Sequence, residues 1–323
     1  MKLLCKQKFS SILLACTILS PILLQTVSFN DETVMFSLSQ QLPVDRVRQQ
    51  ATAITVKILA KGALGSGTIV HQMGETYTVL TNQHVLQAGI APYFVQTSDG
   101  ITHAARVISV PELKKYDLAM LQFKVTVPRY AVAQFGVSKF LQIGEEVFAA
   151  GYPVLLQSSS RQASVAATRN RLSKEFLLHP GRLSLTLDKA LEDGYQVGFT
   201  NELERGMSGG PLLNLYGEVV GINGLSSNSL WEASDLYADG SMPCSSLQKL
   251  IADSSWAIPI ETVSRLIPRF LQPRDSRLQF SSLFKTPLNS SDIDSDFKAY
   301  VPFIIRRMQA NAFIAKGCGE IQK

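Results

Sequence analysis

This chain has 323 residues, of which 46% are hydrophobic and 18% are charged. The length leaves room for about two domains of about 150 residues each, and the low charged fraction excludes a charge-rich disordered chain or a coiled coil. The formal net charge of +5 is too small to indicate binding to nucleic acid, particularly because Lys2, Lys6 and Lys8 lie in the leader described next.

Residues 1–29 have the pattern of an export leader. The three lysines precede an uncharged stretch from Phe9 to Leu24 that is rich in leucine and isoleucine, which is the order of a secretory signal. No clear small-residue cleavage site follows. The pattern therefore predicts an exported protein, periplasmic or secreted, and leaves open a cleaved signal, an uncleaved membrane anchor or a lipid attached at Cys16.

From residue 54 onward, short apolar runs alternate with turn residues, which predicts β-strands. The runs are 54–59, 68–70, 77–80, 93–96, 106–110, 118–123 and 147–149, then 176–178, 183–187, 195–200, 211–214 and 219–222. Because no long helical pattern separates them, they predict an all-β sandwich or barrel in two parts. The first convincing helical pattern comes late, with apolar residues at 263, 266, 267 and 270 after Pro259.

The end of the chain has a different pattern. Pro268, Pro273 and the polar residues 274–277 are typical of a linker, and the apolar residues between Phe297 and Ala312 predict one face of a further helix. We expect this helix to dock on the β-rich body, because its basic residues are too few to favour a membrane-bound helix.

Of the four cysteines, Cys5 and Cys16 lie in the leader, which leaves Cys244 and Cys318. An exported protein permits a disulfide between these two residues, and two free buried thiols fit the sequence equally well. The cysteines do not have the spacing of metal ligands.

Three polar side chains lie at positions suited to catalysis. His84 follows the apolar run 77–80, where a rigid strand can aim an imidazole. Asp117 precedes the apolar run 118–121, and a carboxylate buried there needs a partner such as a histidine N–H. Ser208 lies between glycines in the segment 206–211, where a tight backbone can turn N–H groups toward a substrate oxygen.

The order of these residues separates two classes of hydrolase. Gly-x-Ser-x-Gly also marks the nucleophile of α/β-hydrolases, in which the histidine follows the serine. All four histidines of this chain precede Ser208. The order His84, Asp117, Ser208 is instead that of the chymotrypsin-type enzymes.

Residues 81–85, 117–121 and 206–212 together resemble the motifs of bacterial trypsin-like serine peptidases on the HtrA/Deg side of the chymotrypsin clan. Residues 65–70, 151–153 and 256–260 are similar as well, so the resemblance covers about residues 54–270. It implies a chymotrypsin-like double β-barrel with a C-terminal helix. Residues 45–140 would form the first barrel, 141–272 the second, and 273–323 a linker and helical tail.

The resemblance also implies a mechanism. Ser208 would be the nucleophile of a serine endopeptidase that acts on polypeptide substrates, His84 its general base and Asp117 the group that orients His84. The N–H groups of Gly206 and Ser208 would form the oxyanion hole. This chemistry needs no metal or cofactor. A catalytically silent binding or scaffold protein with the same double barrel is the alternative.

Several features depart from the family pattern. Met207 occupies the position before the nucleophile at which animal trypsin-like enzymes have an aspartate, and too few residues follow Pro273 for a PDZ domain. Glu202 has the offset from Ser208 at which some trypsin-like enzymes place an acid that selects arginine or lysine. Glu204 would share its face if the strand continued, and the sequence favours the alternative that both are solvated surface acids.

Overall fold

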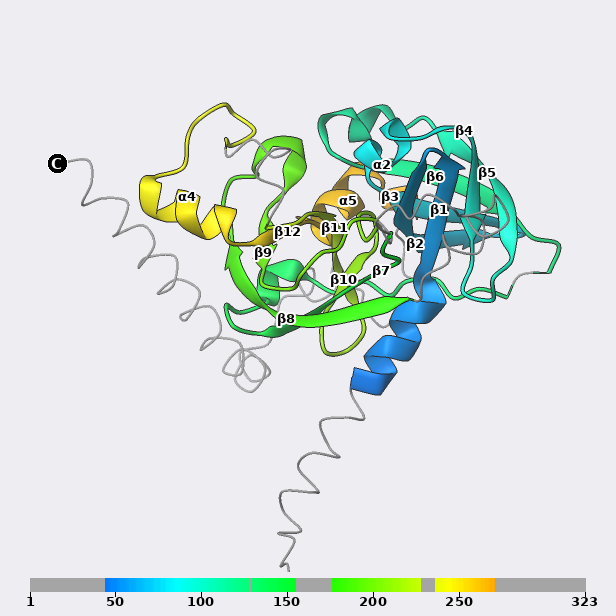
Figure 1. Ribbon diagram of the computed structural model, residues 1–323, viewed down its shortest axis with the longest axis horizontal. Coiled ribbons are helices and arrows are strands. Elements are labelled where there is room, and N and C mark those ends of the chain that lie inside the picture. Colours follow the sequence, from blue (N-terminus) through cyan, green and yellow to red (C-terminus); the bar gives the residue numbers. More distant parts are fainter. Residues whose placement is uncertain (1–43, 128, 155–175, 228–235, 271–323) are drawn as a thin grey trace, which may run out of the picture. The chain divides into compact units, whose positions relative to one another are not determined.

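Two closed β-barrels, each of six antiparallel strands, form most of the structure. The structure is a computed structural model that describes residues 44–127, 129–154, 176–227 and 236–270. These residues all belong to one compact unit of the chain. The strand order is β1-β2-β3-β6-β5-β4 in the first barrel and β10-β11-β12-β9-β8-β7 in the second (Figure 1). The prediction of an all-β double barrel is confirmed.

The strands follow the order of the apolar runs in the sequence. Those of the first barrel are β1 (Thr55–Lys61), β2 (Ala63–Met73), β3 (Thr76–Thr81), β4 (Ile90–Gln96), β5 (Thr102–Ile108) and β6 (Ala119–Lys124). Those of the second are β7 (Glu146–Gly151), β8 (Leu177–Thr186), β9 (Val197–Phe199), β10 (Pro211–Leu213), β11 (Val219–Leu225) and β12 (Ser255–Pro259).

Strands that face both a barrel interior and the other barrel are buried on both sides. In β3, Val79 belongs to the interior cluster of the first barrel, whereas its neighbour Leu80 belongs to a cluster shared by both barrels. In β7, Val147 packs inside the second barrel and Phe148 joins the shared cluster. Because successive side chains of a strand point to opposite faces, both faces of these strands are covered, and buried residues follow one another along the chain instead of alternating with exposed ones.

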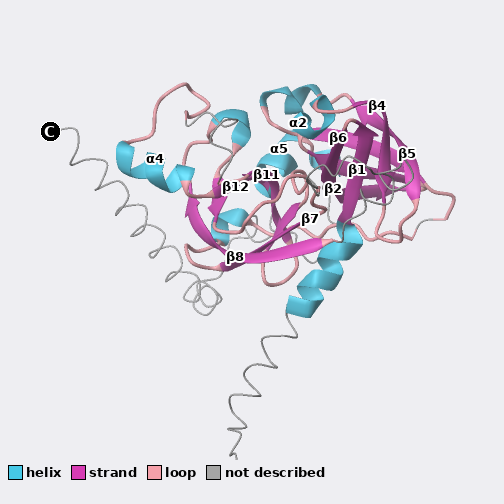
Figure 2. Cartoon of the chain, viewed as in Figure 1, coloured by secondary structure: helices cyan, strands magenta, loops and turns pink. Residues whose placement is uncertain are grey.

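Helices are short in the described part of the chain, and strands dominate both barrels (Figure 2). The α-helices are residues 44–54, α2 (Gln83–Gln87), α4 (Ser245–Ala252) and α5 (Ile260–Leu266). The 3₁₀ turns are Pro111–Lys115, Ser138–Phe140, Glu192–Gly194 and Pro268–Phe270. The late helical pattern is thus confirmed as α5, which ends before Pro268 because proline has no N–H and disfavours helical backbone before it.

The expectation that the first helix comes late is wrong. Residues 44–54 form a helix whose Val47, Ala51 and Ile54 are at most 4% exposed and join the cluster shared by the barrels. Helix α4 and strand β12 were not predicted as elements. The two runs at 176–178 and 183–187 are in one strand, β8, which pairs with β7 across Pro180 and Gly181.

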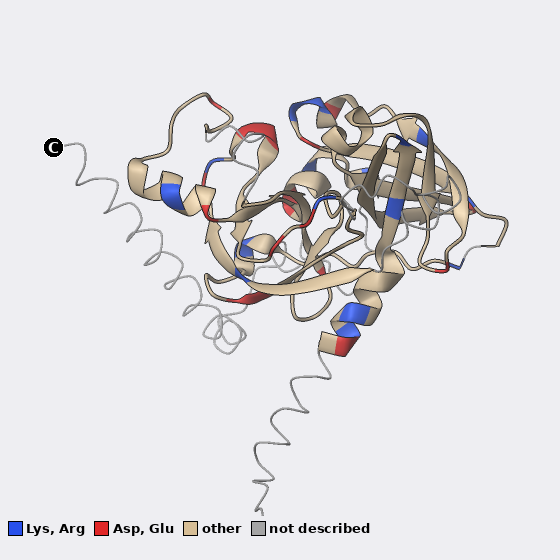
Figure 3. Ribbon diagram, viewed as in Figure 1, with Lys and Arg blue, Asp and Glu red and all other residues tan. Residues whose placement is uncertain are grey.

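Charged residues of both signs are interspersed over the ribbon (Figure 3). The helices in the described part of the chain are all too short or too polar to cross a lipid bilayer. The leader and the C-terminal helix predicted from the sequence lie outside the described residues, as does the linker apart from Pro268, which begins the 3₁₀ turn Pro268–Phe270.

Candidate active site

His84 lies at the beginning of α2, directly after β3 ends at Thr81. Its backbone N–H donates to Asp117 Oδ1 at 2.8 Å, and its ring Nδ1 lies 2.6 Å from Asp117 Oδ2. The His84 side chain is 43% exposed, whereas that of Asp117 is 8% exposed. The imidazole of His84 is therefore partly exposed to solvent, and its carboxylate partner Asp117 is buried. This is the arrangement that the triad hypothesis predicts for these two residues.

Asp117 is held by contacts on all sides. Its carbonyl oxygen accepts from Asn82 Nδ2 at 2.7 Å, its N–H donates to the carbonyl of Asp193 at 2.9 Å, and Oδ2 also accepts from the hydroxyl of Tyr195. Burial raises the pKa of Asp117, but the hydrogen bonds from His84 and Tyr195 and the charge of His84 together keep that pKa below its ordinary value. Asp117 is thus an ionised acceptor at neutral pH.

The ionised carboxylate fixes the tautomer of the histidine. Because Asp117 Oδ2 accepts the hydrogen bond, the proton of a neutral His84 ring lies on Nδ1. The lone pair is then on Nε2, which is the nitrogen that would accept a proton from a nucleophile.

Ser208 belongs to the second barrel, in the turn before β10. Its Oγ donates to the carbonyl oxygen of Gly224 at 3.1 Å and not to His84. Catalytic hydrogen bonds are often long or misaligned without substrate and tighten when it binds. The structure therefore brings His84 and Asp117 together directly and leaves the contact between Ser208 and His84 as a prediction.

Ser66 of β2 links the serine turn to the first barrel. Its N–H donates to the carbonyl of Ser208 at 2.9 Å, and its Oγ donates to the carbonyl of Gly206 at 2.7 Å. The same Oγ accepts from the N–H of Tyr152 at 2.8 Å. Because these bonds join residues far apart in the chain, they fix the serine turn against the barrel that carries His84.

Gly209 of the serine turn packs directly against the first barrel. Its φ is +86°, and a Cβ there would lie 2.2 Å from the carbonyl oxygen of Ser66 and 2.3 Å from Thr81 Oγ1. Thr81 is three residues before His84, so this contact sets how near the serine turn comes to the imidazole. Only glycine fits the position without moving one barrel.

We expect Gly209→Ala to lower the free energy of unfolding by about 3 kcal/mol, because overpacking adds to the cost of a left-handed backbone. Gly100→Ala is the matched control: its φ is +81°, but nothing lies within 4 Å of the added Cβ. We expect that control to lose only about 1 kcal/mol. Urea denaturation measures both values. Equal losses would contradict the close approach of the barrels at Gly209.

The backbone around Ser208 has two available donors. Within the described residues, the N–H groups of Gly206 and Ser208 have no protein acceptor, whereas the N–H of Met207 donates to Glu204 and that of Gly209 to Asn223. These two N–H groups are the ones predicted to form the oxyanion hole.

The peptide before Gly206 has a defined orientation. The carbonyl of Arg205 accepts from the N–H of Val154 at 2.7 Å. In a trans peptide the C=O and the following N–H point in opposite directions, so the N–H of Gly206 is turned away from Val154. The positive φ of Gly206, +98°, is a conformation that favours glycine.

The predicted pocket acids have different surroundings. Glu202 is exposed, and its carbonyl oxygen lies 2.8 Å from His179 Nδ1. Glu204 is partly buried, and its Oε1 lies 3.5 Å from His179 Nε2. Their role in selecting a substrate side chain stays a prediction. Met207, between the oxyanion donors, is fully buried among apolar residues of the second barrel.

Cys244 is disulfide-bonded and directly precedes α4. Cys318 lies outside the described residues, so its pairing with Cys244 stays a prediction. No group of three or more His, Cys, Asp or Glu side chains among the described residues could hold a metal ion.

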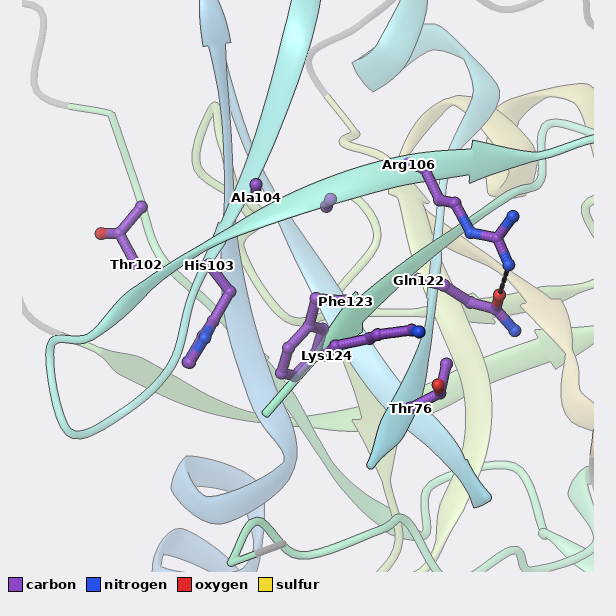
Figure 4. Close-up of a pocket in the computed structure, with 9 residues that line it drawn as sticks. Thr76, Thr102, His103, Ala104, Arg106, Gln122, Phe123 and Lys124 are labelled. Atoms are coloured by element: carbon purple, nitrogen blue, oxygen red, sulfur yellow. Dashed lines mark hydrogen bonds between the residues drawn. The ribbon is translucent and has the colours of Figure 1, made fainter. Parts of the chain in front are cut away.

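A pocket of about 610 Å³ lies on the first barrel (Figure 4). It is lined by Thr76, Thr102, His103, Ala104, Ala105, Arg106, Gln122, Phe123 and Lys124. Thr76 begins the strand whose other end, Thr81, leads to His84, so the two sites are about 16 Å apart along β3. Because the pocket lies that far from His84, we assign it no part in the chemistry; within it, Arg106 and Gln122 hydrogen-bond each other at 2.8 Å.

The sequence of residues 65–222 matches the trypsin-like peptidase domain. The serine protease HTRA1 of Xenopus laevis is 36% identical over 166 residues, which cover 50% of this chain and 31% of that protein. The mitochondrial serine protease HTRA2 of Drosophila grimshawi is 31% identical over 223 residues, which cover 69% of this chain and 42% of that protein. The chain thus spans less than half the length of these curated relatives.

Proposed function

Because this chain carries a trypsin-like peptidase domain related to the HtrA serine proteases, we propose that it is an exported serine endopeptidase. It hydrolyses polypeptides through an acyl-enzyme intermediate, with His84, Asp117 and Ser208 as the triad. The observation that carries this proposal is the double hydrogen bond of His84 to the buried Asp117 carboxylate, made beside a serine turn that Ser66 ties to the same barrel.

In the first half of the reaction, Ser208 turns from Gly224 toward His84, and its Oγ bonds to the carbonyl carbon of the scissile peptide. The hydroxyl proton passes to His84 Nε2, and Asp117 stabilises the imidazolium. The N–H groups of Gly206 and Ser208 donate to the oxyanion, and each donor contributes about 3 kcal/mol to transition-state stabilisation.

In the second half, His84 returns the proton to the amine nitrogen as the carbon–nitrogen bond breaks, and the amine leaves. Water then attacks the carbonyl carbon of the acyl ester and gives a proton to His84. His84 returns this proton to Ser208 Oγ as the ester bond breaks, which releases the carboxylic acid and the free Ser208 hydroxyl. No other reactant is needed.

The leader supports the export part of the proposal. Lysines followed by the uncharged residues 9–24 favour an exported protein, periplasmic or secreted, with the membrane reached only through an uncleaved anchor or a lipid. Glu202 and Glu204 are the acids that would favour a basic residue before the cleaved bond.

A peptide-library digest analysed by mass spectrometry tests the proposal. We expect the wild-type protein to cleave internal peptide bonds and Ser208→Ala to leave the library intact. Glu202→Gln and Glu204→Gln, run beside them, show whether either acid sets a preference for arginine or lysine. A folded wild-type protein that cleaves nothing would favour the catalytically silent binding protein, and cleavage retained by Ser208→Ala would remove Ser208 from the mechanism.

A further inference from the structure

The carboxylate of Asp117 is bonded from both barrels. From the first barrel, His84 donates its backbone N–H to Oδ1 and its ring N–H to Oδ2. From the second barrel, the hydroxyl of Tyr195 donates to Oδ2. The orientation of the carboxylate therefore depends on residues that are brought together only when the barrels are docked.

The side chain of Tyr195 is buried beside this site. Its side chain is 2% exposed and packs in the cluster that both barrels share. A Cβ on Gly224 would lie 2.1 Å from the Tyr195 hydroxyl, and the carbonyl of Gly224 is the acceptor for Ser208. The phenol oxygen thus lies between the buried end of the triad and the strand residue that holds the serine.

The turn before Tyr195 has the shape that this contact needs. Asp193 and Gly194 both have positive φ, +58° and +92°, and such a backbone is unfavourable for a residue other than glycine. The turn places the carbonyl of Asp193 on the N–H of Asp117 at 2.9 Å. A Cβ on Gly194 would lie 2.3 Å from the ring of Tyr116.

A second segment, which contains Leu236 and Ala238, hydrogen-bonds to the backbone just before this turn. The N–H of Glu192 donates to the carbonyl of Leu236 at 3.0 Å, and the N–H of Ala238 donates to that of Ala190 at 2.9 Å. The strained turn is therefore held on one side by this segment and on the other by Asp117.

We propose that Tyr195 is a positioning residue that fixes the Asp117 carboxylate from the second barrel and so couples barrel docking to the orientation of His84. The inference rests on the proposed function. The hydroxyl acts through Asp117 and touches no reacting atom. It restricts rotation of the carboxylate and draws negative charge from Oδ2, the oxygen that also bonds the imidazole.

The charges around Asp117 set the direction of the expected pH effect. The titratable groups that face it are His84 on α2, Tyr195 and Asp193 on the turn, with Glu192 and Tyr116 beside them. Burial and the charge of Asp117 raise the pKa of Tyr195 well above its ordinary value, so the phenol remains a donor. Without that donor the carboxylate stabilises the imidazolium more strongly, which raises the pKa of His84.

Tyr195→Phe tests the proposal, and Tyr77→Phe is the matched control. Tyr77 is fully buried in the first barrel, and its hydroxyl bonds the backbone of Tyr130, away from the triad. We expect kcat of Tyr195→Phe to fall about tenfold with KM changed less than about twofold, because the lost bond orients the catalytic groups and not the substrate. The acid limb of kcat/KM should move up by about 0.5 pH unit.

The pKa of His84, followed by NMR titration of its ring, is a second measurement that needs no turnover. It should rise by about 0.5 unit in Tyr195→Phe and stay at the wild-type value in Tyr77→Phe. A wild-type protein that hydrolyses no peptide but shows this shift would contradict the proposed function alone. An unchanged pKa and pH profile in Tyr195→Phe, or equal changes in both variants, would overturn the role of Tyr195.

Discussion

Ser208→Ala is expected to lower kcat about 10⁴- to 10⁶-fold on a peptide that the wild-type protein cleaves. The substitution removes the oxygen that we propose as the nucleophile, while the turn keeps its backbone bonds to Ser66, Asn223 and Glu204. We therefore expect the thermal unfolding midpoint to stay close to that of the wild type. Initial rates with a fluorogenic peptide and a thermal melt measure both quantities.

Ser264→Ala is the control for this prediction. Ser264 lies on α5, and its hydroxyl donates to the backbone of Ile260, so its loss removes one hydroxyl without touching the site. We expect its kcat to remain within about twofold of the wild type. A Ser208→Ala protein that retains a tenth of the wild-type rate would show that another group is the nucleophile.

Asp117→Asn is expected to lower kcat about 10⁴-fold, because it reverses the histidine tautomer. The backbone N–H of His84 needs an acceptor at Oδ1, 2.8 Å away, so the amide oxygen takes that place. The NH₂ group then faces Nδ1 and donates to it, which leaves the ring proton on Nε2. A protonated Nε2 cannot accept the proton of Ser208.

Asp99→Asn is the matched control, since Asp99 is also paired, with Arg129 at 3.1 Å, but lies on the surface of the first barrel. We expect its kcat to be unchanged. Near wild-type turnover in Asp117→Asn, measured at the same pH and substrate concentration, would contradict the assignment of Asp117 as the group that orients His84.

The sequence was sufficient for the architecture because this fold buries many strands on both faces. Runs such as 77–80 and 147–149 are mostly apolar, and turn residues separate the successive runs, so both barrels follow from strand patterns and from a resemblance carried by three ordered motifs. His84 and Asp117 were predictable for a related reason. Each lies where a polar segment meets an apolar run, and a buried carboxylate needs a donor.

The parts that were missed depend on contacts between distant residues. Helix 44–54 has apolar residues at 47, 51 and 54, a pattern that would have predicted it, but so short a helix is stabilised mainly by the cluster shared by the barrels. The sequence offered one weak signal for Tyr195, which is its position directly after Asp193 and Gly194 at the start of an apolar run. The role that we propose for its hydroxyl depends on the hydrogen bond to Asp117, which lies 78 residues earlier in the chain.

The most direct test of the central claim, that His84 activates Ser208, is mass spectrometry of the folded wild-type protein after reaction with an organophosphonate. We predict one covalent adduct, located on Ser208, whose formation is abolished in Ser208→Ala and slowed strongly in Asp117→Asn. An adduct on another residue, or no adduct on a folded protein incubated with peptide activators, would contradict it.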